Sequence, residues 1–134
     1  MAAWSGLVYQ AGTLTGNGNS GWLKLPLLAV ENAIVRLVPA DLATDETLDL
    51  DLNVAWDSSG SGDVKIHDFT QVDSNNTAEN VILPGEDSVG ILWKELGTNA
   101  GILGAPMPPY WKLTWTLGGS TKSMTFALYA TLLG

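Results

Sequence analysis

The chain has 134 residues, of which 14 are acidic and 6 basic, so its formal net charge is −8, and it has no cysteine. This length fits one domain, and the absence of cysteine excludes disulfides and thiolate metal ligands. The negative charge excludes the basic footprint of a nucleic-acid-binding protein and disfavours contact with anionic membranes. We therefore expect a single domain, residues 1–134, with neither a nucleic-acid nor a membrane partner.

Short apolar runs between glycine and proline clusters predict many short β-strands in the first third of the chain. The runs are too short and too interrupted to form a helical stripe. The predicted strands cover residues 7–9, 13–15, 22–25 and 33–38. Because the start of the chain is apolar, we also expect residues 1–10 to form an arm over a partner.

The clearest strand covers residues 47–56, where apolar and mostly polar residues alternate with a period of two. Such alternation predicts one buried and one solvated face, and it places Trp56 in the core. The polar run 57–63 then turns the chain. A second strand is expected over residues 64–69.

The second half of the chain is predicted to contain a polar loop at residues 73–79, a short strand at 81–83 and further strands at 110–117 and 124–133. The segment 89–96 is ambiguous and 97–109 is expected to be loop. Gly118-Gly119-Ser120 has the composition of a hairpin turn between the last two strands. The pattern predicts an all-β fold of eight or nine strands, either an antiparallel two-sheet sandwich of jelly-roll type or a barrel.

Charge is distributed unevenly along the chain. Twelve of the fourteen acids lie between Asp41 and Asp87, and none follows Leu96. The last third is therefore core or interface. Both faces of the last predicted strand are apolar, which places that strand at the centre of a sheet or at an interface. The candidate interface residues are Trp4, Leu7, Tyr9, Trp93, Pro106, Pro108, Tyr110, Tyr129 and Leu133.

Catalytic chemistry finds little support in the sequence. His67 is the only histidine, and the chain has no cysteine and no serine in a nucleophile-elbow context. Asp49 and Asp51 share one face of a regular strand, which indicates a solvated face and not a glycosidase pair. The loop between Asp57 and Asp63 lacks the spacing of a dedicated calcium loop, and whether it binds calcium stays open. We expect no enzyme activity, no cofactor and no dedicated metal site.

Three segments read TLDLDLNVAWDS at 47–58, VKIHDFTQV at 64–72 and PYWKLTWTLGGS at 109–120. Together they resemble small β-sandwich structural proteins of tailed bacteriophages. The resemblance covers strand and turn patterns, not chemistry. The turn after Asp57 is longer than the tight Asp-Gly turn of those proteins, and the insert before Tyr110 is long.

The resemblance implies a virion component on the capsid surface. A head decoration (cement) protein, bound to the major capsid protein and forming a homotrimer, is the first expectation, and a tail or neck component is the second. A different alternative starts from the six tryptophans, which would form a sugar-binding platform if several of them lay exposed in a row.

Overall fold

The computed structural model describes residues 2–27, 29–83 and 107–134, which form nine β-strands and no helix. In chain order the strands are β1 (Ala3–Gln10), β2 (Gly18–Asn19), β3 (Leu23–Lys24), β4 (Asn32–Ala40), β5 (Thr47–Ala55), β6 (Val64–Asp68), β7 (Glu79–Leu83), β8 (Tyr110–Gly118) and β9 (Thr125–Leu133).

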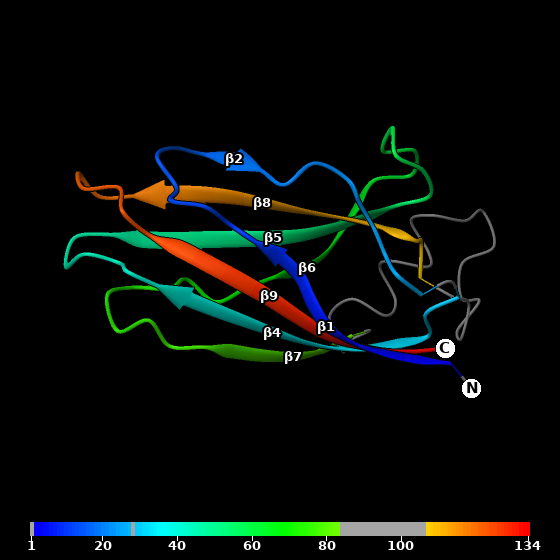
Figure 1. Cartoon of the computed structure of the whole chain (residues 1–134). Helices are drawn as coiled ribbons and strands as arrows, with labels where there is room; N and C mark the ends of the chain where they lie inside the picture. The colour runs from blue at the N-terminus through cyan, green and yellow to red at the C-terminus, as the bar shows by residue number, and fades with distance from the viewer. Residues whose placement is uncertain (1, 28, 84–106) are drawn as a thin grey trace.

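The strands form two antiparallel sheets that lie one above the other (Figure 1). The four-stranded sheet has the order β1-β9-β4-β7, and the five-stranded sheet has the order β2-β8-β5-β6, with β3 also paired to β8. Neither sheet closes on itself. The prediction of an all-β two-sheet sandwich is therefore confirmed, and the barrel alternative is excluded. The two ends of the described chain meet at one end of the sandwich, where Gly134 N donates to Ala2 O at 2.9 Å.

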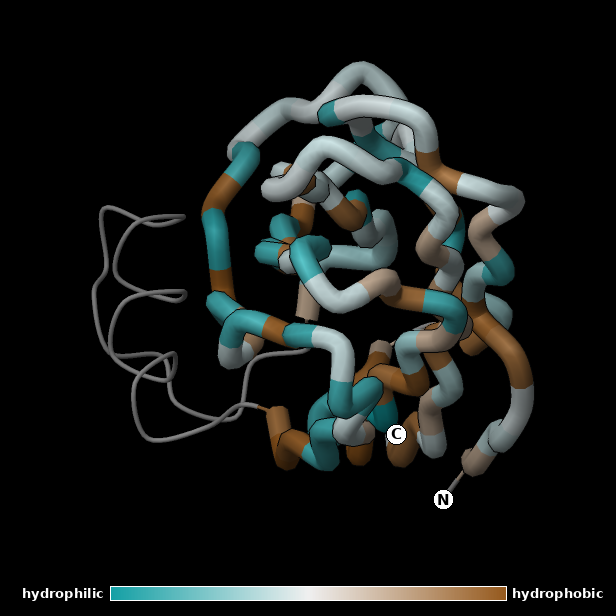
Figure 2. The backbone as a smooth tube through the Cα atoms, turned by 90° about the vertical axis from the view of Figure 1, so that its left-hand side faces the viewer, coloured by the Kyte–Doolittle hydropathy of each residue, from teal (hydrophilic) through white to brown (hydrophobic). Residues whose placement is uncertain are grey.

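The core lies between the sheets and is built from alternate residues of the long strands, an alternation that Figure 2 shows along the backbone. Each strand turns one side chain in two inward, because successive Cβ atoms point to opposite faces. These inward residues include Ala33, Val35, Leu37, Leu48, Leu50, Leu52, Val54, Trp111, Leu113, Phe126, Leu128 and Leu132. Alternate residues of β8 and β9, in the acid-free last third, thus form core, and β9 lies centrally between β1 and β4, as its two apolar faces predict.

The prediction of a hairpin turn at Gly118-Gly119-Ser120 is wrong. β8 and β9 belong to different sheets, so this turn carries the chain from one layer to the other. Gly119 has a φ of 99°, and an added Cβ would collide with the main-chain carbonyl of Asp45. Ser120 N in turn donates to Asp45 Oδ2 at 2.8 Å. The turn is therefore fixed by the neighbouring β4–β5 connection, a contact that local sequence does not reveal.

The prediction that Trp56 belongs to the core is also wrong, since its side chain is 49% exposed. The regular alternation ends at Ala55, because Trp56 N donates to Ser61 O and the chain enters the turn. Once the backbone leaves the ladder, the period of two no longer decides which way the next side chain points. The remaining apolar residues of the pattern, such as Leu48 and Val54, are buried as predicted.

Of two predicted strands near the start of the chain, one is absent from the structure and the other is shorter than predicted. Residues 13–15 form no strand, although Leu14 is buried and its N donates to Met124 O. Of residues 22–25 only the two-residue β3 pairs. This part of the chain passes from one sheet to the other, so it cannot follow one partner strand for long. The ambiguous segment 89–96 lies outside the described residues.

The start of the chain, predicted as an arm, contains the sheet strand β1, which pairs with β9 from Ala3 to Gln10. The register shifts between Leu7 and Tyr9, which is a β-bulge. Trp4 and Tyr9 pack partly against the core. Contact between this segment and a partner stays a prediction, and such contact would involve an edge strand that is already folded.

Candidate protein-interaction surface

The outer face of the four-stranded sheet is almost free of charge. Its four strands contain only two charged residues, Arg36 in β4 and Glu79 in β7. Glu79 pairs in register with the buried Leu37, so its side chain points to the inner side of the sheet. Arg36 is therefore the single charge that these strands present outward.

Four large apolar side chains are exposed on this outer face: Leu7 (47%), Ile34 (48%), Ile82 (67%) and Tyr129 (43%). We call these four residues the outer patch. Leu7 is paired with Tyr129 across β1 and β9, and Ile34 is paired with Ile82 across β4 and β7. The two pairs occupy adjacent rows of the same face, so the patch is continuous across all four strands.

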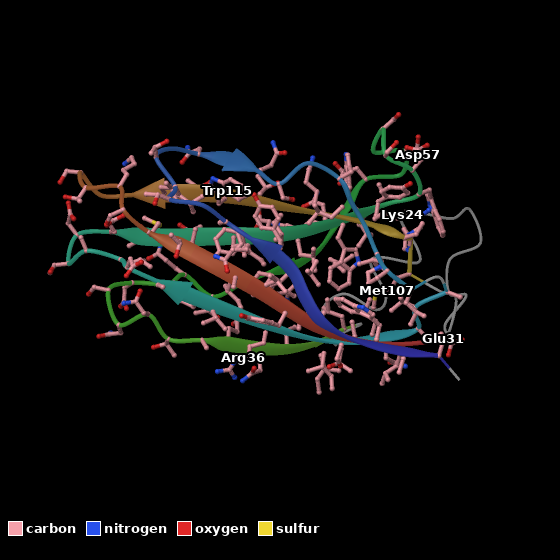
Figure 3. All side chains as sticks on the ribbon, viewed as in Figure 1. Lys24, Glu31, Arg36, Asp57, Met107 and Trp115 are labelled. Atoms are coloured by element: carbon pink, nitrogen blue, oxygen red, sulfur yellow. The ribbon has the colours of Figure 1, made fainter. Side chains whose placement is uncertain are left out.

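A shallow depression of about 310 Å³ lies within the outer patch, and its lining includes Ile34, Arg36 and Tyr129. Arg36 is opposite Tyr129 in the register and donates from Nη1 to Asn80 Oδ1 at 3.1 Å. Figure 3 shows its side chain projecting away from the body of the sandwich. Since a guanidinium has five N–H donors, this arrangement orients Arg36 and leaves donors for a carboxylate of a partner.

The outer face of the other sheet carries many charged side chains. Asp49 and Asp51 of β5 point outward, and Asp68 of β6 lies opposite Asp51. Partial burial, followed by the neighbouring Asp68, raises the pKa of Asp51 above its ordinary value. Lys112 of β8 and Lys65 of β6 lie on the same side, so this face carries charges of both signs. The two broad faces are thus a charged face and a nearly uncharged apolar face, and a protein partner buries the second at a lower desolvation cost.

The structure separates the predicted interface residues into groups. Leu7 and Tyr129 belong to the outer patch, and Leu133 is half-buried further along β9 on the same side. The other described members are half-buried or buried within the chain itself: Trp4, Tyr9, Pro108 and Tyr110. Trp93 and Pro106 lie outside the described residues. The outer patch therefore includes only two of the predicted interface residues, Leu7 and Tyr129.

Sequence reasoning missed Ile34, Ile82 and Arg36. The run from Ala33 to Val38 is apolar except for Arg36, so it hides which side chains face the core. Arg36 is the available signal, because a charged residue inside a buried strand marks the outward positions, and Ile34 is two residues away.

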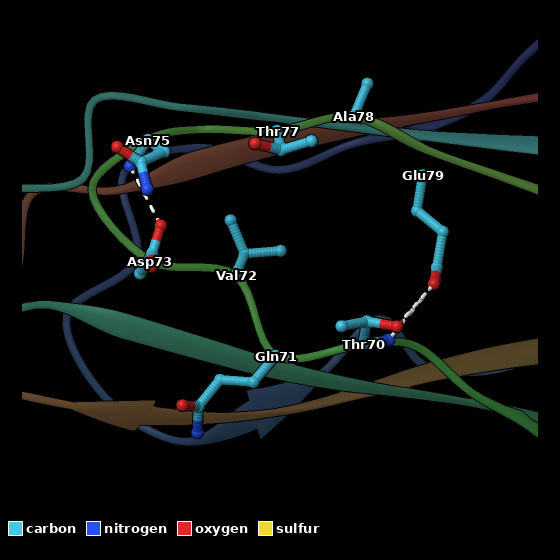
Figure 4. Close-up of a pocket in the computed structure, with 8 residues that line it drawn as sticks. All are labelled: Thr70, Gln71, Val72, Asp73, Asn75, Thr77, Ala78 and Glu79. Atoms are coloured by element: carbon cyan, nitrogen blue, oxygen red, sulfur yellow. Dashed lines mark hydrogen bonds between the residues drawn. The ribbon is translucent and has the colours of Figure 1, made fainter.

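A second hollow, of about 390 Å³, lies beside the loop that joins β6 and β7 (Figure 4). Glu79 closes one side of it and accepts hydrogen bonds from Thr70 N and Thr70 Oγ1, the latter at 2.7 Å. His67 Nε2 lies 3.6 Å from Glu79 Oε2. These contacts tie the edge strands of the two sheets together. The Glu79 carboxylate is thereby engaged in structural contacts, and neither serine nor cysteine is among the residues that line the described part of this hollow.

The carboxylates considered for calcium have separate partners. Asp57 Oδ1 accepts hydrogen bonds from the main-chain N–H groups of Ser59 and Ser61, and the hydrogen bonds with Ser61 are the main reason that the pKa of Asp57 is lowered. Asp63 accepts from Asn53 Nδ2 at 2.7 Å. Within residues 2–27, 29–83 and 107–134, no three histidine, cysteine, aspartate or glutamate side chains gather to hold a metal ion.

The exposed large aromatic residues of the described chain do not form a row. Trp56 lies at the end of β5 in one sheet, and Tyr129 lies on the outer face of the other sheet. Trp22 is half-buried, with Lys112 Nζ 4.6 Å from its ring centroid. The part of the chain that the structure describes therefore lacks the flat row of aromatics that a sugar-stacking platform needs.

Comparisons with family models, with curated proteins and with solved structures find no match for this chain. In the described ranges, no helix has the length and hydropathy that a membrane crossing requires.

Proposed function

We propose that this chain is a structural protein of a tailed-phage virion, a decoration protein that binds the capsid shell through the outer patch. The observation that carries the proposal is the contrast between a chain of net charge −8 and a sheet face whose strands present no outward carboxylate and four exposed large apolar side chains. Apolar patches rimmed by polar residues are typical of protein-binding sites on monomers.

A weakly binding apolar surface such as the outer patch is sufficient for a protein that decorates a shell. Burial of apolar area contributes about 25 cal/mol per Å², so a few hundred Å² per contact gives modest affinity at one site. Many equivalent sites on a lattice then stabilise the whole particle. The charged face of the second sheet would point to solvent, and the net charge of −8 would keep densely placed copies apart. The sequence resemblance to phage sandwich proteins supports the same assignment.

The partner surface should offer apolar groups and one carboxylate. Arg36 lies in the middle of the outer patch, where its charge loses water on binding and needs a negative partner. We propose that the major capsid protein supplies this surface. A tail or neck subunit with the same chemistry is the alternative location within the virion.

The test is co-sedimentation of the purified protein with shells of the phage that encodes it, followed by cryo-electron microscopy of decorated particles. Ile34→Glu places a charge in the outer patch and should lower shell binding at least tenfold. Thr116→Glu, which adds the same charge at an exposed position on the opposite sheet, is the matched control and should bind normally. Absence of the chain from purified virions, or equal binding by both variants, would contradict the proposal.

A further inference from the structure

We infer that the free edge of β1 pairs, antiparallel, with β1 of a second copy of this chain. β1 is an edge strand of the four-stranded sheet, with β9 on one side and no strand of the described chain on the other. An edge of this kind presents unpaired main-chain N–H and C=O groups, which are a template for another strand.

The hydrogen-bond pattern identifies which residues of β1 face outward in the sheet plane. Gly134 N donates to Ala2 O, so Ala2 and Gly134 form a hydrogen-bonded pair. Because such pairs alternate along an antiparallel ladder, Trp4 and Gly6 also direct their main-chain groups to β9. Ala3, Ser5 and Leu7 therefore direct theirs to the free edge, up to the bulge after Leu7.

The other sheet edges are protected against edge pairing by charge or by short length, and β1 has neither. β6 carries Lys65 and Asp68, β7 carries Glu79, and β2 and β3 have only two residues each. β1 has eight residues, and no charged residue occurs before Lys24. Charge and short length are the usual protection against edge pairing. The only protection visible on β1 is its bulge.

A second copy fits this edge better than an unrelated strand because β1 is complementary to itself. With a twofold axis at Ser5, Ala3 faces Leu7 of the second copy and Trp4 faces Gly6 of the second copy. Each pair combines a small residue with a large one, and the Trp4 ring already lies over Gly6 within one chain. The three outward residues of each copy would then exchange about six main-chain hydrogen bonds.

Charge does not oppose this pairing, although each copy carries −8. The nearest charge in the sheet, Arg36, lies two strands away in β4, about 10 Å from β1 at the usual strand spacing. The paired segment from Ala3 to Leu7 is about 17 Å long, so pairing along one edge buries less than a standard interface of about 800 Å² per partner. We therefore expect a concentration-dependent dimer with a dissociation constant in the micromolar range.

The first test measures mass by light scattering and sedimentation equilibrium over a wide concentration range. Wild-type protein should form dimers, and Ser5→Pro should raise the dimer dissociation constant at least tenfold. Proline removes an N–H that points to the free edge and leaves the ladder to β9 intact. If Ser5→Pro fails to fold, Ser5→Lys replaces it, since two lysines would then face each other across the axis. Ile82→Lys on the opposite edge is the control and should dimerise normally.

The second test uses the absence of native cysteine. Ser5→Cys should form an intermolecular disulfide under mild oxidation, because Cα atoms about 5.5 Å apart in a hydrogen-bonded pair are within disulfide range. Ile82→Cys should not form one. A wild-type protein that stays monomeric at all concentrations, or any oligomer that Ser5→Pro leaves intact, would overturn the inference. Both tests use the isolated protein, so their failure is distinct from a failure to bind shells.

Discussion

Phe126 packs edge-on against Trp115, with ring centroids 5.7 Å apart and ring planes at 68°. Phe126 belongs to β9 in one sheet and Trp115 to β8 in the other, so this contact joins the two layers. Tyr9 of β1 contacts both rings. These three rings thus pack within the chain, and the outer patch lies on the outer side of the same strand β9.

Phe126→Ala should destabilise the fold by about 3–5 kcal/mol, because it removes a fully buried ring and leaves a cavity between the sheets. Urea unfolding followed by tryptophan fluorescence measures the change. Tyr129→Ala, three residues along the same strand but exposed, should cost less than about 1 kcal/mol. Equal losses in the two variants would show that the assignment of inner and outer faces is wrong.

Glu46→Gln should lower the melting temperature at neutral pH by several degrees. Burial tends to raise the pKa of Glu46, but hydrogen bonds from Ala43 N, Ser123 Oγ and Ser123 N outweigh it and lower the pKa overall. A lowered folded-state pKa gives stability that is present above the unfolded value of about 4.3 and is lost as pH falls through the folded value.

The difference between Glu46→Gln and wild type should therefore shrink as the pH is lowered from 5 toward 3. Calorimetry of both proteins across this range measures it. A difference that stays constant at all pH values would mean that shape, and not ionisation, makes Glu46 important.

Asp51→Asn should stabilise the protein at pH 7. Burial and then the nearby Asp68 raise the pKa of Asp51, so the folded state binds a proton more readily than the unfolded state does. The ionised form thus weakens the fold at neutral pH, and this cost disappears as pH falls below the ordinary aspartate range. The gain from Asp51→Asn should vanish there too, as thermal unfolding at pH 7 and pH 3 can measure.

Asp49→Asn provides the comparison for Asp51→Asn, because Asp49 lies on the same face of β5. Asp49 Oδ2 accepts a hydrogen bond from Gln71 Nε2 at 2.9 Å, so its replacement should not stabilise the fold. Stabilisation of equal size by both variants would point to general relief of negative charge, and not to the pair of Asp51 with Asp68.

Trp56 should dominate the quenching of tryptophan fluorescence by acrylamide, because its ring is 49% exposed whereas Trp111 and Trp115 are buried. Trp56→Phe should remove a large part of the quenchable emission, and Trp111→Phe should remove little. If Trp56→Phe left the quenching unchanged, Trp56 would belong to the core after all.

The sequence alone predicts the strands that have regular partners. In β5, Leu48, Leu50 and Leu52 alternate with polar residues, so burial of one face follows from the pleat. The apolar composition of β9 likewise predicts a central strand. These features depend on short stretches of sequence. Burial of the apolar side chains stabilises them in any antiparallel sandwich.

Only the tertiary structure decided which sheet each strand joins and which side of an apolar strand remains exposed. The local sequence around Gly119 is compatible with a hairpin. In the structure this turn contacts Asp45, and the chain passes to the other sheet. Ile34 and Val35 are equally apolar, but only Val35 faces the other sheet and is buried. Such choices follow from pairing between residues distant in sequence, and so the outer patch and the free edge of β1 emerge only from the assembled sandwich.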